Sequence, residues 1–280
     1  MYFKRFRRAK HSIFDAVFGF RGDVRLAGLL HDKTLMDAFQ LFSRLFPRYM
    51  PLDPVFYGRK KLRSQYAAPS WIKDMNLLIS PGVGPDISFD LELMASGIHT
   101  VLIDKQMPPN PCQLPSCCQY IPKFLGTLAQ SAHSPESFVS LGSLLLHYSG
   151  KSFERKVLQM DIEGAEWPIL LCDSSALAQF EIIIIELHGI SSLFAYSMNA
   201  TVYSGLSFLL DKFSPFFARI NDVNGYATVH GYKIPELLEL TLVNKSIDIE
   251  DAFDEAPFIL ETDDLGISDS IQKLLGAIPV

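Results

Sequence analysis

Side chains that could do chemistry stand at the ends of three apolar runs of this sequence. They are Asp161 and Glu163 after one run, Glu186 and His188 at the end of another, and Asp104 after a third. Carboxylate and imidazole groups commonly act as general bases near neutral pH. If the runs are neighbouring strands of a parallel sheet, their carboxyl ends meet at one edge, and these side chains face one cleft.

The acidic and imidazole side chains support more than one interpretation. Asp161 or His188 could take the proton of a hydroxyl group, with Glu163 as a further catalytic candidate. Asp161 and Glu163 could also hold a divalent ion, but no third ligand is evident, so we predict no metal site. As plain structure, the acids would cap the following helix and His188 would bond a backbone carbonyl. Asn221, which follows a later run, joins Glu186 and His188 as a candidate for substrate binding, unless it only forms a turn.

The segment from 77 to 90 has the pattern of a buried strand, a glycine turn and the start of a helix. Gly82 and Gly84 would let the chain turn sharply and bring a ligand close to main-chain N–H groups at the helix start. Asp104 lies 22 positions after Gly82, where an acidic side chain can accept hydrogen bonds from the ribose hydroxyls of an adenine nucleoside. The alternative is a tight turn and a surface Asp without a ligand. The candidate cofactor-binding residues are Ser80, Gly82, Val83, Gly84, Asp86, Asp104 and Asp161.

The identity of residue 86 helps to distinguish between two kinds of adenine-containing cofactor. The dinucleotide fingerprint has a third glycine where this chain has Ile87, and its helix start faces a pyrophosphate. A carboxylate at that helix start would repel pyrophosphate, whereas it suits a ligand that carries sulfonium and ammonium groups. The sequence therefore favours S-adenosyl-L-methionine as the cofactor. A nicotinamide-dependent oxidoreductase is the less favoured alternative.

Seven short apolar runs would position these residues. The predicted strands cover 76–80, 99–103, 119–124, 157–160, 181–187, 216–220 and 238–243. Their alternation with helical patterns predicts an α/β fold with a doubly wound, seven-stranded, mostly parallel sheet. The run from Ile182 to Ile185 has no polar alternation, so we expect an interior strand with both faces covered. Prolines between 105 and 118 predict a loop, and 191–213 a helix.

Three regions are predicted along the chain. Residues 1–70 form a helical N-terminal extension, clearest from Asp32 to Phe46, with Asp32 as the cap and Pro47 as the stop. Residues 71–245 form the cofactor-binding domain. Residues 246–280 form an acidic C-terminal extension with a short helix near 269–278.

Composition limits the partners of the chain. A net charge of −6 argues against a general nucleic-acid binder, which needs clustered basic groups. No apolar run approaches the roughly 18 residues of a membrane-spanning helix, so no transmembrane segment is expected. The basic N-terminus is either a solvated end or a peripheral contact with an anionic membrane surface. The four cysteines lack zinc-site spacing, and free thiols fit a cytoplasmic protein. The oligomeric state is left open.

The chain resembles the FkbM-like group of methyltransferases over about residues 74 to 245. The matching segments are Gly82-Val83-Gly84-Pro85-Asp86-Ile87-Ser88-Phe89-Asp90, Met160-Asp161-Ile162-Glu163-Gly164-Ala165-Glu166, Glu186-Leu187-His188-Gly189 and Pro235-Glu236-Leu237-Leu238-Glu239-Leu240-Thr241. The resemblance implies a Rossmann-like class I methyltransferase domain at 71–245, with S-adenosyl-L-methionine as donor. It also implies a hydroxyl of a sugar, glycan or related small metabolite as acceptor.

Two positions depart from this resemblance. Ser80 stands where an acidic residue often ends the first strand, so Asp86 or Asp161 would have to recognise the amino group of the donor. Arg219 stands near the place of a frequent histidine. The alternative from another class is a non-catalytic Rossmann-like interaction module, although the intact glycines and Asp104 argue against a decayed site.

Overall fold

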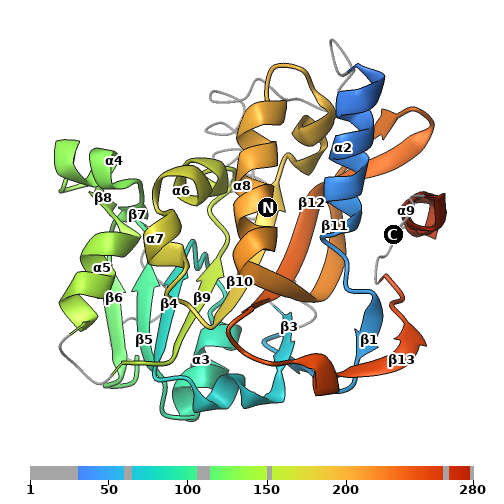
Figure 1. Ribbon diagram of the computed structural model, residues 1–280. Coiled ribbons are helices and arrows are strands. Elements are labelled where there is room, and N and C mark those ends of the chain that lie inside the picture. The colour runs from blue at the N-terminus through green and yellow to red at the C-terminus, as the bar shows by residue number, and fades with distance from the viewer. Residues whose placement is uncertain (1–30, 60–64, 106–113, 150–152, 261–264, 278–280) are drawn as a thin grey trace, which may run out of the picture.

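The computed structural model describes residues 31–59, 65–105, 114–149, 153–260 and 265–277. Helices and loops cover both faces of one sheet of seven strands (Figure 1). The strands, in spatial order, are β11 (Phe213–Val229), β12 (Tyr232–Asn244), β10 (Ile182–His188), β9 (Lys156–Met160), β4 (Leu77–Pro81), β5 (His99–Ile103) and β6 (Cys118–Ile121). All seven predicted runs therefore form strands of this sheet.

The sheet is mixed but mostly parallel. Neighbouring strands from β10 to β6 pair in parallel, while β12 is antiparallel to both β10 and β11. From β4 the chain moves outward to β5 and β6, and then returns to β9 and β10 on the other side of β4. The strand order thus reverses between β4 and β9, and a ligand crevice is expected at the carboxyl ends of such a pair.

Helices connect the strands on both sides of this reversal. The helix α3 (Ser88–Ala95) joins β4 to β5, and α5 (Leu141–Tyr148) precedes β9. The helices α6 (Glu166–Cys172) and α7 (Ser174–Leu177) join β9 to β10. The predicted helix at 191–213 is divided into η4 (Ile190–Phe194) and α8 (Asn199–Lys212).

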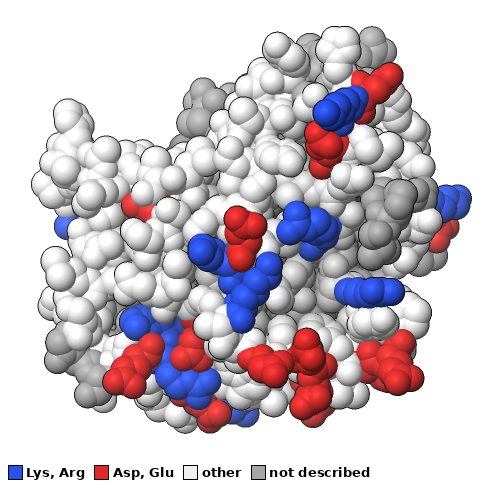
Figure 2. Space-filling view, in the orientation of Figure 1, with Lys and Arg blue, Asp and Glu red and all other residues white. Residues whose placement is uncertain are grey.

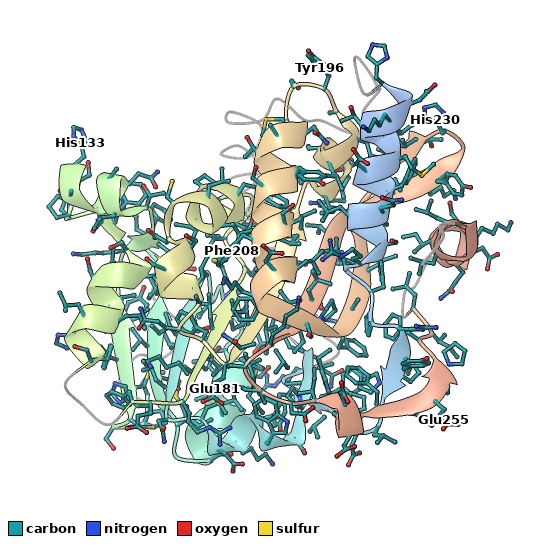
Figure 3. All side chains as sticks on the ribbon, viewed as in Figure 1. His133, Glu181, Tyr196, Phe208, His230 and Glu255 are labelled. Atoms are coloured by element: carbon teal, nitrogen blue, oxygen red, sulfur yellow. The ribbon has the colours of Figure 1, made fainter. Side chains whose placement is uncertain are left out.

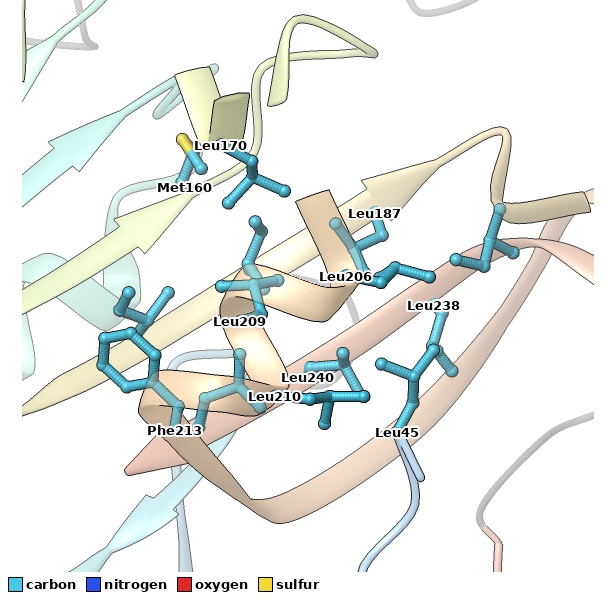
Figure 4. Packing of buried hydrophobic residues seen from close by; sticks show 14 of the residues in the cluster. Leu45, Met160, Leu170, Leu187, Leu206, Leu209, Leu210, Phe213, Leu238 and Leu240 are labelled. Atoms are coloured by element: carbon cyan, nitrogen blue, oxygen red, sulfur yellow. The ribbon is translucent and has the colours of Figure 1, made fainter. Parts of the chain in front are cut away.

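Apolar side chains of the parallel strands alternate between two cores. Ile183 and Ile185 belong to the larger core, whereas Ile182 and Ile184 pack in a smaller one with Phe89 of α3. The prediction of an interior strand covered on both faces is therefore confirmed. Leucines of α8 lie over β10 and β12 in the larger core, as Figure 4 shows.

The prediction of a helical region from 1 to 70 is wrong for its second part. The helix α2 (Asp32–Ser43) is present, but His31 is its N-cap, with no side-chain capping bond. After it come three short strands, β1 (Tyr49–Pro51), β2 (Pro54–Tyr57) and β3 (Tyr66–Pro69), and the turn η2 (Ser70–Asp74). β2 pairs with β3, and β1 pairs with the distant β13 (Phe253–Pro257). Long-range pairing of this kind outweighs local helical spacing. Residues 1–30, which include the basic N-terminus, lie outside the described part.

The last two strands of the sheet are much longer than predicted. β11 and β12 form a hairpin whose pairing runs from Phe213 with Asn244 to Val229 with Tyr232, with irregularities on the way. Asn221 therefore lies within a strand, and the alternative of a turn at this position is wrong. A helix is confirmed near the C-terminus as α9 (Leu265–Ala277), which contacts β12.

The remaining described elements are small. They are β7 (Phe124–Leu125), α4 (Leu128–His133), β8 (Phe138–Val139) and η5 (Glu250–Ala252). Thr127 and Gln130 form a capping box at the start of α4. The predicted loop at 105–118 contains no helix or strand before Cys118 in its described part.

Surface features of the described residues bear on partners. No described helix combines the length and the apolar character that crossing a membrane requires. On the face in Figure 2, acidic and basic side chains are interspersed, and few charges lie over α4 to α7. Cys117, Cys118 and Cys172 carry free thiols.

Candidate functional site

The ends of four neighbouring strands meet at the point where the strand order reverses. Pro81 pairs with Ile103, and Ile185 pairs with Met160. The next residues along these strands are Asp104, Gly82, Asp161 and Glu186, which continue the same row across the sheet. The Gly82 N–H donates to the Ile103 carbonyl at 2.8 Å, and the Asp161 N–H donates to the Pro81 carbonyl at 3.3 Å. The predicted convergence of these strand ends is confirmed.

Gly82 makes the close contact between β4 and β9 feasible. Its φ is +82°, and a Cβ atom at this position would lie 1.6 Å from the Asp161 carbonyl oxygen. Any side chain here would push the two strand ends apart. The glycine is therefore required by contact within the chain, whereas the sequence pattern was interpreted as close approach of a ligand.

Of the two glycines in this turn, Gly84 is the one that faces open space. Its φ is +58°, and a Cβ atom built there meets nothing within 4 Å. The Gly84 N–H donates to Asp104 Oδ2 at 3.2 Å, so the acidic side chain and the glycine turn form one unit. Val83, between the two glycines, is buried against Leu102. A ligand that lies on this turn would approach Gly84 and Asp104.

Asp86 and Ser80 bind groups within the chain. The two oxygens of Asp86 accept hydrogen bonds from the Ser88 N–H at 3.1 Å and the Ser88 hydroxyl at 3.2 Å, at the start of α3. Ser80 is fully buried and donates to Gln159 Oε1 at 2.8 Å. Ser80 thus lies beneath the row of strand ends.

Asp90 is a second buried carboxylate on this side of the site. It lies in the first turn of α3 and is 4% exposed, and its Oδ1 has no hydrogen-bond partner among the described residues. Burial raises the pKa of Asp90 to about 7, although its contact with Ser80 lowers it in part. The Asp90 carboxyl is therefore partly protonated at neutral pH.

His188 lies among acidic side chains at the end of β10. Its Nε2 atom is 3.5 Å from Glu163 Oε2, and 3.8 Å from both Asp161 Oδ1 and Glu186 Oε2. On the opposite side of the ring, Nδ1 is 3.1 Å from Glu166 Oε1. The His188 side chain is only 4% exposed, so four carboxylates surround one buried imidazole.

Glu166 was not among the predicted site residues. It is fully buried, and its Oε1 atom also accepts a hydrogen bond from the Ile162 N–H at 3.0 Å. The helix α6 has no side-chain capping bond, so Glu166 does not act as its N-cap and instead closes the turn that leads into the helix. An acid in front of the apolar run that starts at Trp167 was the available signal. The Trp167 indole N–H donates to the His188 carbonyl at 2.8 Å and fixes the backbone on which the imidazole stands.

The surrounding acids decide the protonation of His188. Burial lowers the pKa of His188, but attraction to Glu166, Glu186 and Asp161 outweighs burial and raises the pKa well above 6.5. Without a bound ion, His188 therefore holds its proton at neutral pH. In this arrangement it is a poor general base, and Asp161 is the better candidate of the two.

Asn221 reaches Glu186 from another strand. Its side-chain amide donates to Glu186 Oε1 at 2.7 Å. Burial raises the pKa of Glu186, while His188 and the Asn221 hydrogen bond oppose this effect. Next to them, Arg219 forms an ion pair with Glu239 and donates to the Gln65 carbonyl at 2.7 Å. The predicted substrate-binding residues Glu186, His188 and Asn221 are thus brought together.

The opposite end of β10 has a simpler arrangement. Glu181, labelled in Figure 3, precedes the strand and pairs with Arg155 at 3.0 Å. This pair is partly exposed. Acids at the amino end of the strand are thus balanced by arginine, whereas those at the carboxyl end surround a histidine.

Comparisons with known proteins identify no family. No family model and no curated protein matches the chain. A crystal structure of WbdD is similar at 16% identity and a TM-score of 0.31, over 74% of this chain and 47% of WbdD. The chain thus spans about half the length of that protein. The resemblance to FkbM-like methyltransferases remains a prediction.

Proposed function

We propose that this protein is an S-adenosyl-L-methionine-dependent methyltransferase that methylates a hydroxyl of a sugar, glycan or related metabolite. The observation that carries the proposal is the row of strand ends at the reversal of strand order. On one side of this row lies the Gly84 turn with Asp104, and on the other lies the acidic cluster around His188. In this proposal the nucleoside would bind on the first side, next to the group that accepts the proton on the second.

The residues on the first side fit an adenine nucleoside. Gly84 leaves open space over the turn, and Asp104 stands at the end of the adjacent strand. A carboxylate at this place can accept hydrogen bonds from ribose hydroxyls. Asp86 adds a negative charge at the start of α3, which suits a cationic ligand better than a pyrophosphate.

The residues on the second side fit a hydroxyl acceptor. When bound, the donor would supply a methyl group on a positively charged sulfur. Asp161 would take the hydroxyl proton as the new oxygen–carbon bond forms and the carbon–sulfur bond breaks, with the bonding pair left on sulfur. Holding the reacting atoms in line can lower the barrier by about 7 to 11 kcal/mol.

The proposal is tested by binding and by turnover. Calorimetry with S-adenosyl-L-methionine, its demethylated product and NAD should show binding of the first two only. Incubation with labelled donor and a panel of glycans and lipid-linked sugars should then transfer label to a hydroxyl. Donor binding without transfer to any acceptor would favour an interaction module, and binding of NAD alone would favour an oxidoreductase.

A further inference from the structure

Asp161, Glu186 and His188 each bring a potential metal ligand to the same point of the molecule. Two carboxylate oxygens and one imidazole nitrogen all lie within 4.8 Å of one another. We propose that these three side chains bind one divalent ion of a first-row transition metal. This differs from the expectation of no metal site, which rested on the lack of a third ligand for Asp161 and Glu163, because the structure brings Glu186 and His188 within reach of Asp161.

The orientation of the His188 ring supports a metal site. Glu166 holds Nδ1 at 3.1 Å, which leaves Nε2 directed toward the acids. A histidine that binds a metal usually donates its other ring N–H to a carboxylate, and this second contact fixes the ring. Glu166, which is fully buried, is well placed for this supporting role.

The spacing of the three ligands also fits an ion. Nε2 lies 3.8 Å from Asp161 Oδ1 and 3.8 Å from Glu186 Oε2. These distances exceed the roughly 2.7–3.2 Å of an ordinary N–H···O hydrogen bond. Two ligands that each lie about 2.0–2.2 Å from one metal ion are separated by roughly 3 to 4 Å. Small side-chain movements would therefore close the three groups around an ion.

A second observation is a buried polar atom in the same cluster. Glu166 Oε2 has no hydrogen-bond partner among the described residues, although the residue is fully buried. It belongs to the carboxylate whose other oxygen contacts His188. A buried carboxylate is costly unless a cation or hydrogen bonds compensate its charge. A divalent ion bound at Nε2 would displace the proton that His188 otherwise holds there, so the cluster would lose one positive charge and gain two.

The ligand set indicates the class of ion. Imidazole suits zinc, iron and nickel, and carboxylates suit magnesium, calcium and manganese. A mixed set of one nitrogen and two carboxylates therefore favours Mn²⁺ or Zn²⁺ over Ca²⁺. The Asp161 side chain is 22% exposed, which leaves access for a further ligand. Only the role of the ion rests on the proposed function, in which it would lower the pKa of the acceptor hydroxyl.

The test is titration of the full chain with Mn²⁺, without donor or acceptor, by calorimetry and electron paramagnetic resonance. We expect one saturable site and a nitrogen coupling from the imidazole in the Mn²⁺ spectrum. Asp161→Asn, Glu186→Gln and His188→Gln should each weaken binding by about tenfold or more. The coupling is measured on the wild type, so it tests the site even where a variant fails to fold.

Glu163→Gln is the matched control, because Glu163 lies as close to His188 but outside the three-ligand group. It should change Mn²⁺ affinity by less than about threefold. Equal losses in Glu163→Gln and the ligand variants would overturn the proposal, since diffuse attraction to acids would explain them. Absence of saturable binding or of nitrogen coupling would also overturn it. Binding of the methyl donor is measured in a separate experiment. Failure of the proposed methyltransferase function can therefore be distinguished from failure of the proposed metal site.

Discussion

Buried carboxyl groups have different partners on the two sides of the point where the strand order reverses. On the side of β4 and β5, Asp104 accepts a hydrogen bond from the Gly84 backbone, while burial raises the pKa of Asp90 to about 7. On the side of β9 and β10, several carboxylates surround His188, whose pKa is raised well above 6.5. On the first side one carboxyl group accepts a backbone N–H, and burial favours protonation of the other. On the second side the carboxylates surround a protonated imidazole. The first is thus suited to a polar ligand such as a ribose, and the second to a proton or a metal ion.

The largest effect is expected at the boundary between the two sides. Gly82→Ala should lower the free energy of unfolding by at least about 4 kcal/mol, because its Cβ atom would lie 1.6 Å from the Asp161 carbonyl oxygen. Gly84→Ala is the matched control. Its Cβ atom meets nothing within 4 Å, and only the φ of +58° costs about 1 to 2 kcal/mol. Urea denaturation compares the two variants, and equal losses would show that the strand ends can separate.

The second prediction concerns the buried carboxyl group of Asp90. The ordinary pKa of an aspartate carboxyl is 3.8, whereas the pKa of Asp90 in the folded chain is about 7. Folding therefore takes up a proton between these values, and the free energy of unfolding falls as the pH rises from about 4 to 7. In Asp90→Asn this loss, up to about 4 kcal/mol, should disappear.

Thermal denaturation at several pH values checks the Asp90 prediction. The Asn variant should have a higher Tm than the wild type at pH 8, and a similar Tm at pH 4. Glu92→Gln, at an exposed position of the same helix, is the control and should change the Tm little at either pH. A Tm difference that is independent of pH would contradict the prediction.

The third prediction concerns the role of Asp161 in turnover. Asp161→Asn keeps the size of the side chain but removes its charge and basicity, so turnover on a verified acceptor should fall by about 100-fold or more. Tm and donor affinity should change little. A drop in donor affinity would instead place Asp161 against the donor, and wild-type turnover would exclude it as base or metal ligand.

The smallest expected effect is on the side of β4 and β5. Asp104→Ala should weaken donor binding by about 1.5 to 3 kcal/mol, the usual contribution of a hydrogen bond to a charged group. Calorimetry measures this change, with Asp86→Asn as a comparison at the start of α3. Unchanged donor affinity in Asp104→Ala would remove the ribose contact from the proposed site.

The local pattern of apolar residues was sufficient to predict the strands in the parallel part of the sheet. Each of its strands is a short apolar run, and the residue after each run is read directly from the sequence. The sequence pattern did not predict the strands that form by pairing with other segments of the chain. The stretch from 49 to 69 forms strands because β1 meets β13 and β2 meets β3. Asn221 continues a strand because β12 extends alongside it.

The residues at the strand ends are read from the sequence alone, because apolar periodicity shows where a buried strand begins and ends. The place of the glycine turn between a strand and a helix is also read from the sequence. The contacts of these residues depend instead on how distant segments fold together. Gly82 allows β4 and β9 to lie close together, and the buried Glu166 side chain contacts His188 Nδ1. Both outcomes depend on atoms from different segments of the chain meeting within a few ångströms, which spacing along one segment does not encode.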